Sequence, residues 1–144
     1  MNEKPPVTSE SEVLAEELRE IVSAFIRNVR ISTGTIRTSQ YETLDLLDTH
    51  HALSIAELAS LRGVKHQSMR LVINELELQG LVQRQKNPQD ARAQLIVLSE
   101  NARALLADAR AKRVEWIAAR LDARLSEAER GDLQKGLAAL HKLL

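Results

Sequence analysis

The chain of 144 residues contains no cysteine, which excludes disulfide bonds, thiolate metal sites and any cysteine redox switch. Aromatic residues make up only 2% of the chain. Alanine and leucine are abundant, so helix is the expected state of the long segments. No apolar run approaches the roughly 18 residues of a membrane-spanning helix. Residues 1–6 lack the hydrophobic region of a signal peptide, and we therefore expect a cytoplasmic protein with no membrane partner.

The motifs of common enzyme chemistries are also missing. The sequence shows no Ser-His-Asp nucleophile spacing, no glycine-rich phosphate loop and no paired buried carboxylates. The adjacent residues His50 and His51 are candidate metal ligands, but neighbouring side chains point apart and no acidic cluster accompanies them. A surface pair is the simpler interpretation. The sequence therefore predicts no catalytic residue, no metal and no cofactor, in a protein that is not an enzyme.

The chain has no surplus charge of either sign, with 20 Lys and Arg against 20 Asp and Glu. This balance weighs against a nucleic-acid partner, because phosphate contacts require cations. The charges are nevertheless unevenly distributed. Residues 3–20 are rich in glutamate, whereas residues 62–74 contain Arg62, Lys65 and Arg70 and no acid. Because the local potential steers a charged partner, this segment keeps DNA binding open.

Residues 54–98 form the stretch around which the chain is organised. The pattern predicts a helix over 54–60, a turn over 61–64, a second helix over 65–79, and strands over 82–86 and 93–98 around a charged loop, 87–92. Gly63 can adopt the positive φ of the turn. Two short helices joined in this way are typical of a helix-turn-helix, whose second helix enters the major groove of DNA. The hairpin adds a wing.

The buried and exposed faces of this motif follow from helical spacing. Positions expected in the core are Leu58, Val64, Met69, Val72, Ile73 and Leu76. On the opposite face of the second helix, Arg70 suits guanine, Gln67 and Asn74 suit adenine, and Leu71 suits a thymine methyl. Ser68 and the start of the helix would hold a phosphate, as would Lys65 and His66. An ordinary solvated polar face is the alternative.

The predicted wing carries its own candidates for DNA contact: Arg84, Lys86, Asp90 and Arg92. Arg92 at the tip is expected to enter the minor groove, whose negative potential attracts arginine. Asp90 is expected to fold back onto Arg84 and stiffen the loop. The alternative is an ordinary charged hairpin that resists edge pairing.

The remaining helices flank this motif. Helices are predicted over 11–31 and over 100–121, the second of these after the cap Ser99. Capping boxes at Ser39–Glu42 and Ser126–Glu129 predict two more helices, which run to about residue 48 and to the end of the sequence. Residues 50–53 are expected to be a link. Residues 1–10 are expected to be disordered. At roughly 1.5 Å per residue, the helix predicted over 100–121 is longer than a small winged core needs, and its surplus apolar surface, with that of the first and last helices, is expected to bind a partner. Such surplus apolar surface usually marks an interface.

Several runs of residues carry a resemblance to a known family: Ser39–Leu47, Ser54–Ala59, Leu76–Val82 followed by Arg84, and Asp90-Ala91-Arg92 ahead of Leu98-Ser99. Over nearly its whole length the chain resembles the MarR (multiple antibiotic resistance regulator) family. The resemblance implies a homodimer joined through its first, fifth and sixth helices, with paired winged lobes. It also implies binding to pseudo-palindromic operators, usually as a repressor that a small, often phenolic, ligand releases.

The resemblance assigns Asp90 and Arg92 to the wing pair of the family, with Arg84 as their partner. The chain departs from the family at Leu71, where members often carry arginine. The adjacent Arg70 is the cation here, which implies a different operator preference.

These observations predict a mainly α (α+β) fold. A single regulator domain over 11–144 would contain a winged helix-turn-helix at 39–98 and dimerisation helices at 11–31 and 99–144. The predicted function is sequence-specific binding of double-stranded DNA by a homodimeric transcriptional repressor, released by a small aromatic or phenolic effector. The alternative is a winged-helix module for protein–protein interaction that does not bind DNA.

Overall fold

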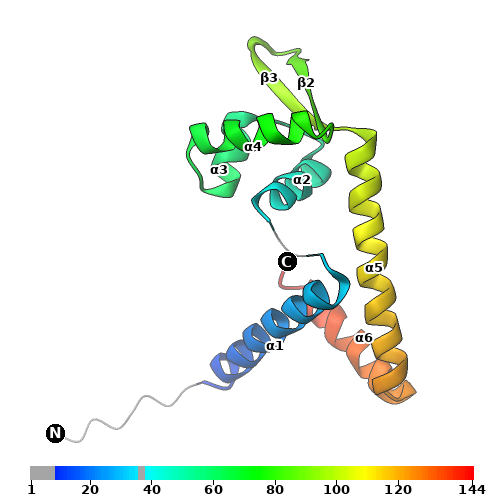
Figure 1. Cartoon of the computed structure of the whole chain (residues 1–144). Coiled ribbons are helices and arrows are strands. Elements are labelled where there is room, and N and C mark those ends of the chain that lie inside the picture. Colours follow the sequence, from blue (N-terminus) through cyan, green and yellow to red (C-terminus); the bar gives the residue numbers. More distant parts are fainter. Residues whose placement is uncertain (1–8, 36–37) are drawn as a thin grey trace, which may run out of the picture. The chain divides into compact units, whose positions relative to one another are not determined.

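The computed structural model describes residues 9–35 and 38–144. The elements follow in the order α1 (Glu10–Thr33), α2 (Ser39–His50), β1 (Ala52–Ser54), α3 (Ile55–Arg62), α4 (His66–Leu78), β2 (Val82–Asn87), β3 (Asp90–Leu98), α5 (Glu100–Arg124) and α6 (Glu127–His141) (Figure 1). The chain divides into two compact units. Ile36–Glu115 is called the winged lobe below, and Met1–Thr35 with Trp116–Leu144 the terminal-helix unit.

The expected disordered segment, 1–10, lies outside the described residues for positions 1–8. The end of that segment is ordered, contrary to the prediction. The hydroxyl of Ser9 accepts a hydrogen bond from the N–H of Glu12, and the carboxylate of Glu12 accepts one from the N–H of Ser9. This capping box satisfies N–H groups that a helix start leaves open, so α1 begins at Glu10.

The winged lobe contains a three-stranded antiparallel sheet with the strand order β1-β3-β2. β2 and β3 form the predicted hairpin, with Val82 opposite Leu98. The sequence predicts only a link before α3, but the structure shows β1 there, with Leu53 opposite Ile96. A strand this short has no room for an alternating pattern. Its pairing with the distant β3 creates it, which local sequence does not reveal.

A hydrophobic core joins the sheet to the helices of the winged lobe. Leu58, Met69 and Ile73 have no exposed surface, which confirms the inward faces predicted for α3 and α4. The core contains Leu44, Leu47, Leu53, Leu58, Ala59, Met69, Ile73, Leu76, Val82, Ile96, Leu98, Ala102 and Leu106. The prediction is wrong for Val64, which is 38% exposed because it lies in a surface turn. Val72 is only half-buried against the core.

Serine and threonine caps fix where the helices begin. Two of the predicted capping boxes are present: Ser54 with Glu57 on α3, and Ser126 with Glu129 on α6. The box predicted at Ser39 is wrong, because the cap of α2 is Thr38, whose hydroxyl accepts from the N–H of Tyr41 at 3.1 Å. Ser39 is instead the first residue of α2, and its carbonyl oxygen is bound by Arg62.

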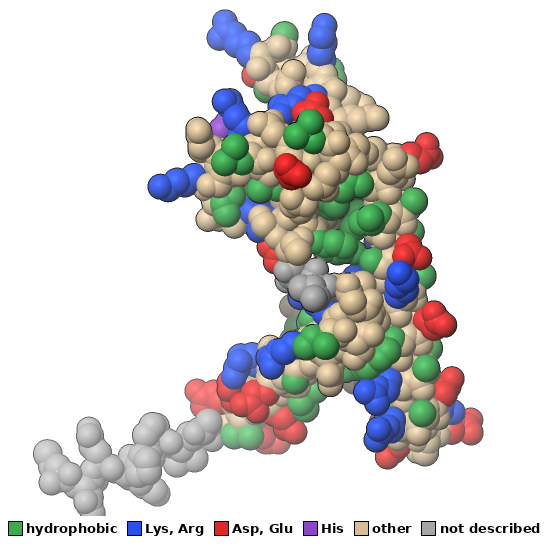
Figure 2. All heavy atoms as spheres, in the orientation of Figure 1, with side chains coloured by type: hydrophobic (Ala, Val, Ile, Leu, Met, Phe, Trp, Pro, Cys, Tyr) green, Lys and Arg blue, Asp and Glu red, His purple; other side chains and the backbone are tan. Residues whose placement is uncertain are grey.

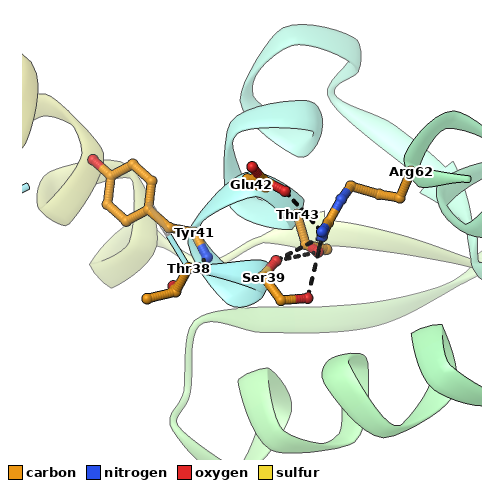
Figure 3. A network of polar contacts seen from close by, with 6 residues as sticks. All are labelled: Thr38, Ser39, Tyr41, Glu42, Thr43 and Arg62. Atoms are coloured by element: carbon orange, nitrogen blue, oxygen red, sulfur yellow. Dashed lines mark hydrogen bonds and ion pairs between the residues drawn. The ribbon is translucent and has the colours of Figure 1, made fainter. Parts of the chain in front are cut away.

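Arg62, at the end of α3, ties this helix to the first turn of α2 (Figure 3). Its Nη1 donates to the carbonyl oxygen of Ser39 at 2.7 Å and to Oγ1 of Thr43 at 2.9 Å. Its Nη2 lies 2.8 Å from Oε2 of Glu42, and the Arg62 side chain is only 13% exposed. Arg62 therefore serves the lobe's interior and does not contribute the surface charge that the sequence pattern suggested.

The terminal-helix unit leaves much apolar surface uncovered within one chain. On α1, Phe25 is 46% exposed and Ile21 59%, and on α6 Leu137 is 59% exposed. Exposed with them are Val13, Leu14, Val22, Ile26, Ile31 and Leu133. The wide stripe predicted for α1 is thus present and unpartnered in the single chain. None of the helices in the described residues is long and apolar enough to cross a membrane.

Candidate nucleic-acid interface

The second helix of the motif, α4, begins directly after a tight turn. Gly63 has a φ of +62°, as predicted, and ends α3 in the left-handed conformation. Lys65 is the N-cap of α4, and no side chain forms a capping hydrogen bond there. The N–H groups of the first turn of α4 are therefore left without a capping side chain. Such a helix start attracts a phosphate group.

The face of α4 that points away from the core is exposed along its length. The exposed residues are Gln67, Ser68, Arg70, Leu71 and Asn74, with Lys65 and His66 at the start of the helix. Leu71 is 64% exposed. A large apolar side chain on an otherwise polar face suits the methyl group of thymine. The residues for which the sequence predicts base and phosphate contacts thus share one solvent-facing surface.

The wing, formed by β2 and β3, projects beyond α4 in Figure 1. It differs from the prediction near its tip, because β3 begins at Asp90 and so contains Arg92. Asn87 lies opposite Asp90, whereas the preceding Lys86 lies opposite Gln94. The residues around Arg92 therefore form a bulge. Bulges redirect side chains at the edges of sheets, and the side chain of Arg92 is exposed.

Arg84 does not bind Asp90, contrary to the prediction and to the pairing that the family resemblance implies. Its Nε donates to Oε2 of Glu77 at 2.8 Å, and its Nη2 donates to Oδ1 of Asn74 at 2.8 Å. Oδ1 of Asp90 accepts from the N–H of Arg92 at 3.0 Å. The short connection between α4 and β2 places the carboxylate of Glu77 near Arg84, whereas Asp90 lies at the tip of the wing. Arg84 thus holds the wing against α4.

An open cleft of about 370 Å³ lies between α4, the wing and the start of α3. It is lined by Ser54, Ile55, Ala56, His66, Arg70, Asn74, Arg84, Arg92, Ala93 and Gln94. Three arginines and a histidine thus face this space, and no acid is among the described residues that line it. A cleft lined by one sign of charge concentrates ions of the opposite sign. A phosphate of a nucleic-acid backbone has the matching charge.

Lys and Arg side chains project from the wing and from the part of the lobe around α3 and α4 in Figure 2. Within the described residues, the side chains of Lys65, Arg70, Lys86 and Arg92 form no ion pair, in contrast to Arg84 and Arg62. Free cations on one surface can displace the counterions of DNA. The net charge of the whole chain is therefore a poor guide to this surface.

His50 and His51, the candidate metal pair, lie at the end of α2. Both are exposed, and His51 has a φ of +69° as the C-cap of that helix. Across residues 9–35 and 38–144, no group of three or more His, Cys, Asp or Glu side chains is placed to hold a metal ion.

Comparisons with known proteins identify the family of the chain. A model of the MarR family matches residues 36–93. HTH-type transcriptional regulators from Mycobacterium bovis and Mycobacterium tuberculosis are each 34% identical to the chain over 123 residues, which are 84% of this chain and 85% of each relative. The chain belongs to the MarR family of transcriptional regulators. Members of this family are DNA-binding regulators and not enzymes.

Similarity to solved structures extends over most of the chain. A transcriptional regulator protein from Pseudomonas aeruginosa superposes with a TM-score of 0.81 at 28% identity, covering 95% of this chain and 97% of that one. A MarR family protein from Bacillus stearothermophilus has a TM-score of 0.72 at 22% identity, with coverages of 94% and 97%. The mainly helical winged-helix fold predicted from the sequence is confirmed.

Sequence reasoning missed the contacts that hold the MarR-type lobe together. Arg84 on β2 binds Asn74 and Glu77 on α4. Helical and strand periodicity relate residues within one element, so neither could predict a contact between these two elements. Arg62 was recognised only as a charge. No signal in the sequence indicates its interior role, because the packing of α3 against α2 is set by the tertiary structure.

Proposed function

We propose that this chain is a homodimeric, sequence-specific DNA-binding repressor. The observation that carries the proposal is the surface shared by α4 and the wing, where exposed base-reading side chains lie beside cations without ion-pair partners among the described residues. α4 would enter the major groove, and the wing would follow the adjacent minor groove. Membership of the MarR family supports the same conclusion.

The side chains on this surface have different roles. In this proposal Gln67, Arg70 and Asn74 read base edges in the major groove, and Leu71 contacts a thymine methyl. Arg92 enters the minor groove. The phosphate contacts come from Lys65, His66, Ser68 and Lys86, with Arg84 and Asp90 shaping the wing. Phosphate contacts would set the register of the protein on the duplex, and base contacts its sequence preference.

The proposed dimer forms through the terminal-helix unit. Apolar side chains on α1 and α6 are exposed in the single chain, with Phe25 46% and Leu137 59% exposed. Exposed apolar surface of this extent is typical of an interface. A two-fold dimer would present two copies of α4, about 34–36 Å apart, to successive turns of a duplex. The operator would then be an inverted repeat.

The proposed effector is a small aromatic or phenolic molecule that releases the DNA. This part rests on the family resemblance. A ligand that binds the folded chain raises its melting temperature, so small aromatic acids can be screened by thermal shift and then added to a preformed DNA complex. An effector must both stabilise the protein and weaken DNA binding.

The experiment that tests the function is a DNA-binding titration with the full chain at two salt concentrations. The duplexes are the promoter region beside the chain's own gene and a scrambled sequence of equal length. We expect tighter binding to the promoter region, and weaker binding to both duplexes at higher salt. Equal affinity for the two duplexes would overturn sequence-specific recognition. An absence of binding to either would favour a protein–protein module.

A further inference from the structure

The hydrogen bond between Asn74 and Arg84 determines which way the Asn74 amide faces. Nη2 of Arg84 lies 2.8 Å from Oδ1 of Asn74. An arginine side chain has only donors, so the amide atom that faces it must be the oxygen. The Nδ2 group of Asn74 is therefore the part of the amide left for another partner. It offers two N–H donors.

Arg84 is itself held in place. Its Nε donates to Oε2 of Glu77 at 2.8 Å, and its Nη1 lies 3.4 Å from Oε1 of Gln94. The side chain of Arg84 is 25% exposed, whereas Asn74 is exposed on the outer face of α4. The partners of Arg84, which lies on β2, come from α4 and from β3. The orientation of the amide thus depends on the wing being seated against α4.

We propose that Arg84 is a positioning residue that makes Asn74 a pure donor toward DNA, so that Asn74 selects guanine over adenine. This inference rests on the proposed function. It replaces the adenine pairing predicted for Asn74 from its residue type. Asn74 and Arg84 both line the cleft between α4 and the wing. A duplex bound to α4 and the wing would therefore contact both residues.

The chemistry of base edges gives the reason. Asparagine pairs with adenine through two bonds, in which the amide oxygen accepts from N6 and the amide nitrogen donates to N7. Here one of the two lone pairs of the oxygen already accepts from a guanidinium, whose positive charge disfavours a second donor at the same oxygen. Guanine presents two acceptors, O6 and N7, and cytosine presents a donor, N4. An amide that only donates fits guanine and opposes cytosine.

The test begins with selection of preferred duplexes from a randomised library by the full wild-type chain. The half-site position read by residue 74 is then identified as the one whose preference Asn74→Ala abolishes. Affinities for duplexes with each of the four bases at that position are measured for every variant. For the wild type we expect guanine to be preferred to adenine by roughly 10-fold.

Two variants separate the role of Arg84 from a general loss of contact. Arg84→Met removes the donors at similar length, which frees the amide to turn, and should shift the preference at that position toward adenine. Arg84→Lys keeps a donor-only side chain and should retain guanine. Asn74→Asp keeps the acceptor for Arg84 but replaces the outward donors with an oxygen, and should shift the preference to cytosine. Melting temperatures verify that each variant is folded.

The outcomes distinguish this inference from the proposed function. Wild-type preference for adenine at the position, or a guanine preference unchanged in both Arg84→Met and Asn74→Asp, would overturn the role of Arg84. Selection of no preferred sequence at all would instead overturn the proposed function. A shift toward adenine in Arg84→Met together with a shift to cytosine in Asn74→Asp supports the inference.

Discussion

The guanidinium of Arg62 donates to the hydroxyl of Thr43 at 2.9 Å, and that hydroxyl donates in turn to the carbonyl oxygen of Ser39 at 2.9 Å. Thr43 is fully buried, so its hydroxyl has no access to water and both of its bonds are internal. The two bonds link the start of α2 to the end of α3. Breaking either of them would leave a polar group unpaired in the protein interior, which is costly.

Replacing Thr43 with valine should destabilise the winged lobe. The shape of the side chain is kept, but Arg62 loses an acceptor in a partly buried position. We expect the free energy of unfolding to fall by about 1–3 kcal/mol. Urea unfolding of the full chain measures it. Thr49→Val, at an exposed site on the same helix, is the matched control and should change stability by about 0.5 kcal/mol or less. Equal losses in the two variants would contradict the role of the Arg62 contact.

Substituting alanine for Gly63 or for Gly136 should change the free energy of unfolding in opposite directions. Gly63 has a φ of +62°, so Gly63→Ala should lower the free energy of unfolding by about 1–2 kcal/mol. Gly136 lies within α6, and nothing lies within 4 Å of an added Cβ. Gly136→Ala should therefore raise stability by about 0.5–1 kcal/mol. Chemical unfolding curves measure both effects, and a gain in stability from Gly63→Ala would contradict the need for a left-handed conformation at residue 63.

Arg70 and Lys65 should affect DNA binding in different ways. Arg70→Ala removes a base contact and should cost about 1–3 kcal/mol on the preferred duplex while relaxing preference at one position. Lys65→Ala removes a phosphate contact, so it should weaken binding to all sequences alike and reduce the salt slope by about 1. Titrations against preferred and scrambled duplexes at several salt concentrations measure these effects. An equal loss on all sequences from Arg70→Ala would rule out base reading by this side chain.

A charge on α1 should disrupt the proposed dimer without unfolding the chain. Phe25 is 46% exposed in the single chain, so Phe25→Glu places the carboxylate where only a partner would bury it. We expect Phe25→Glu to be a monomer at micromolar concentration and the wild type to be a dimer under the same conditions, as measured by analytical ultracentrifugation. Leu78, which is 85% exposed in the winged lobe, provides the control. Leu78→Glu should remain dimeric. A dimer that persists in Phe25→Glu would exclude α1 at this position from the interface.

Local patterns in the sequence were sufficient for most of the fold. The helical spacing of Met69, Ile73 and Leu76 predicted the buried face of α4, and these side chains are fully buried. The positive φ of Gly63 followed from its place in a short turn. Each of these features depends on residues a few positions apart, so a short window of sequence contains the information.

The tertiary structure decided which polar groups meet. β1 exists because a short segment pairs with β3, and Arg84 binds Asn74 and Glu77 because the wing lies against α4. The side chain of Arg62 is largely shielded from solvent because α3 packs on α2. Composition and spacing determined the helices, the turn and the exposed face of α4. They did not determine which residues of different elements form hydrogen bonds with each other. Those partners depend on distance in space, and folding around a common core brings together residues that no sequence period relates.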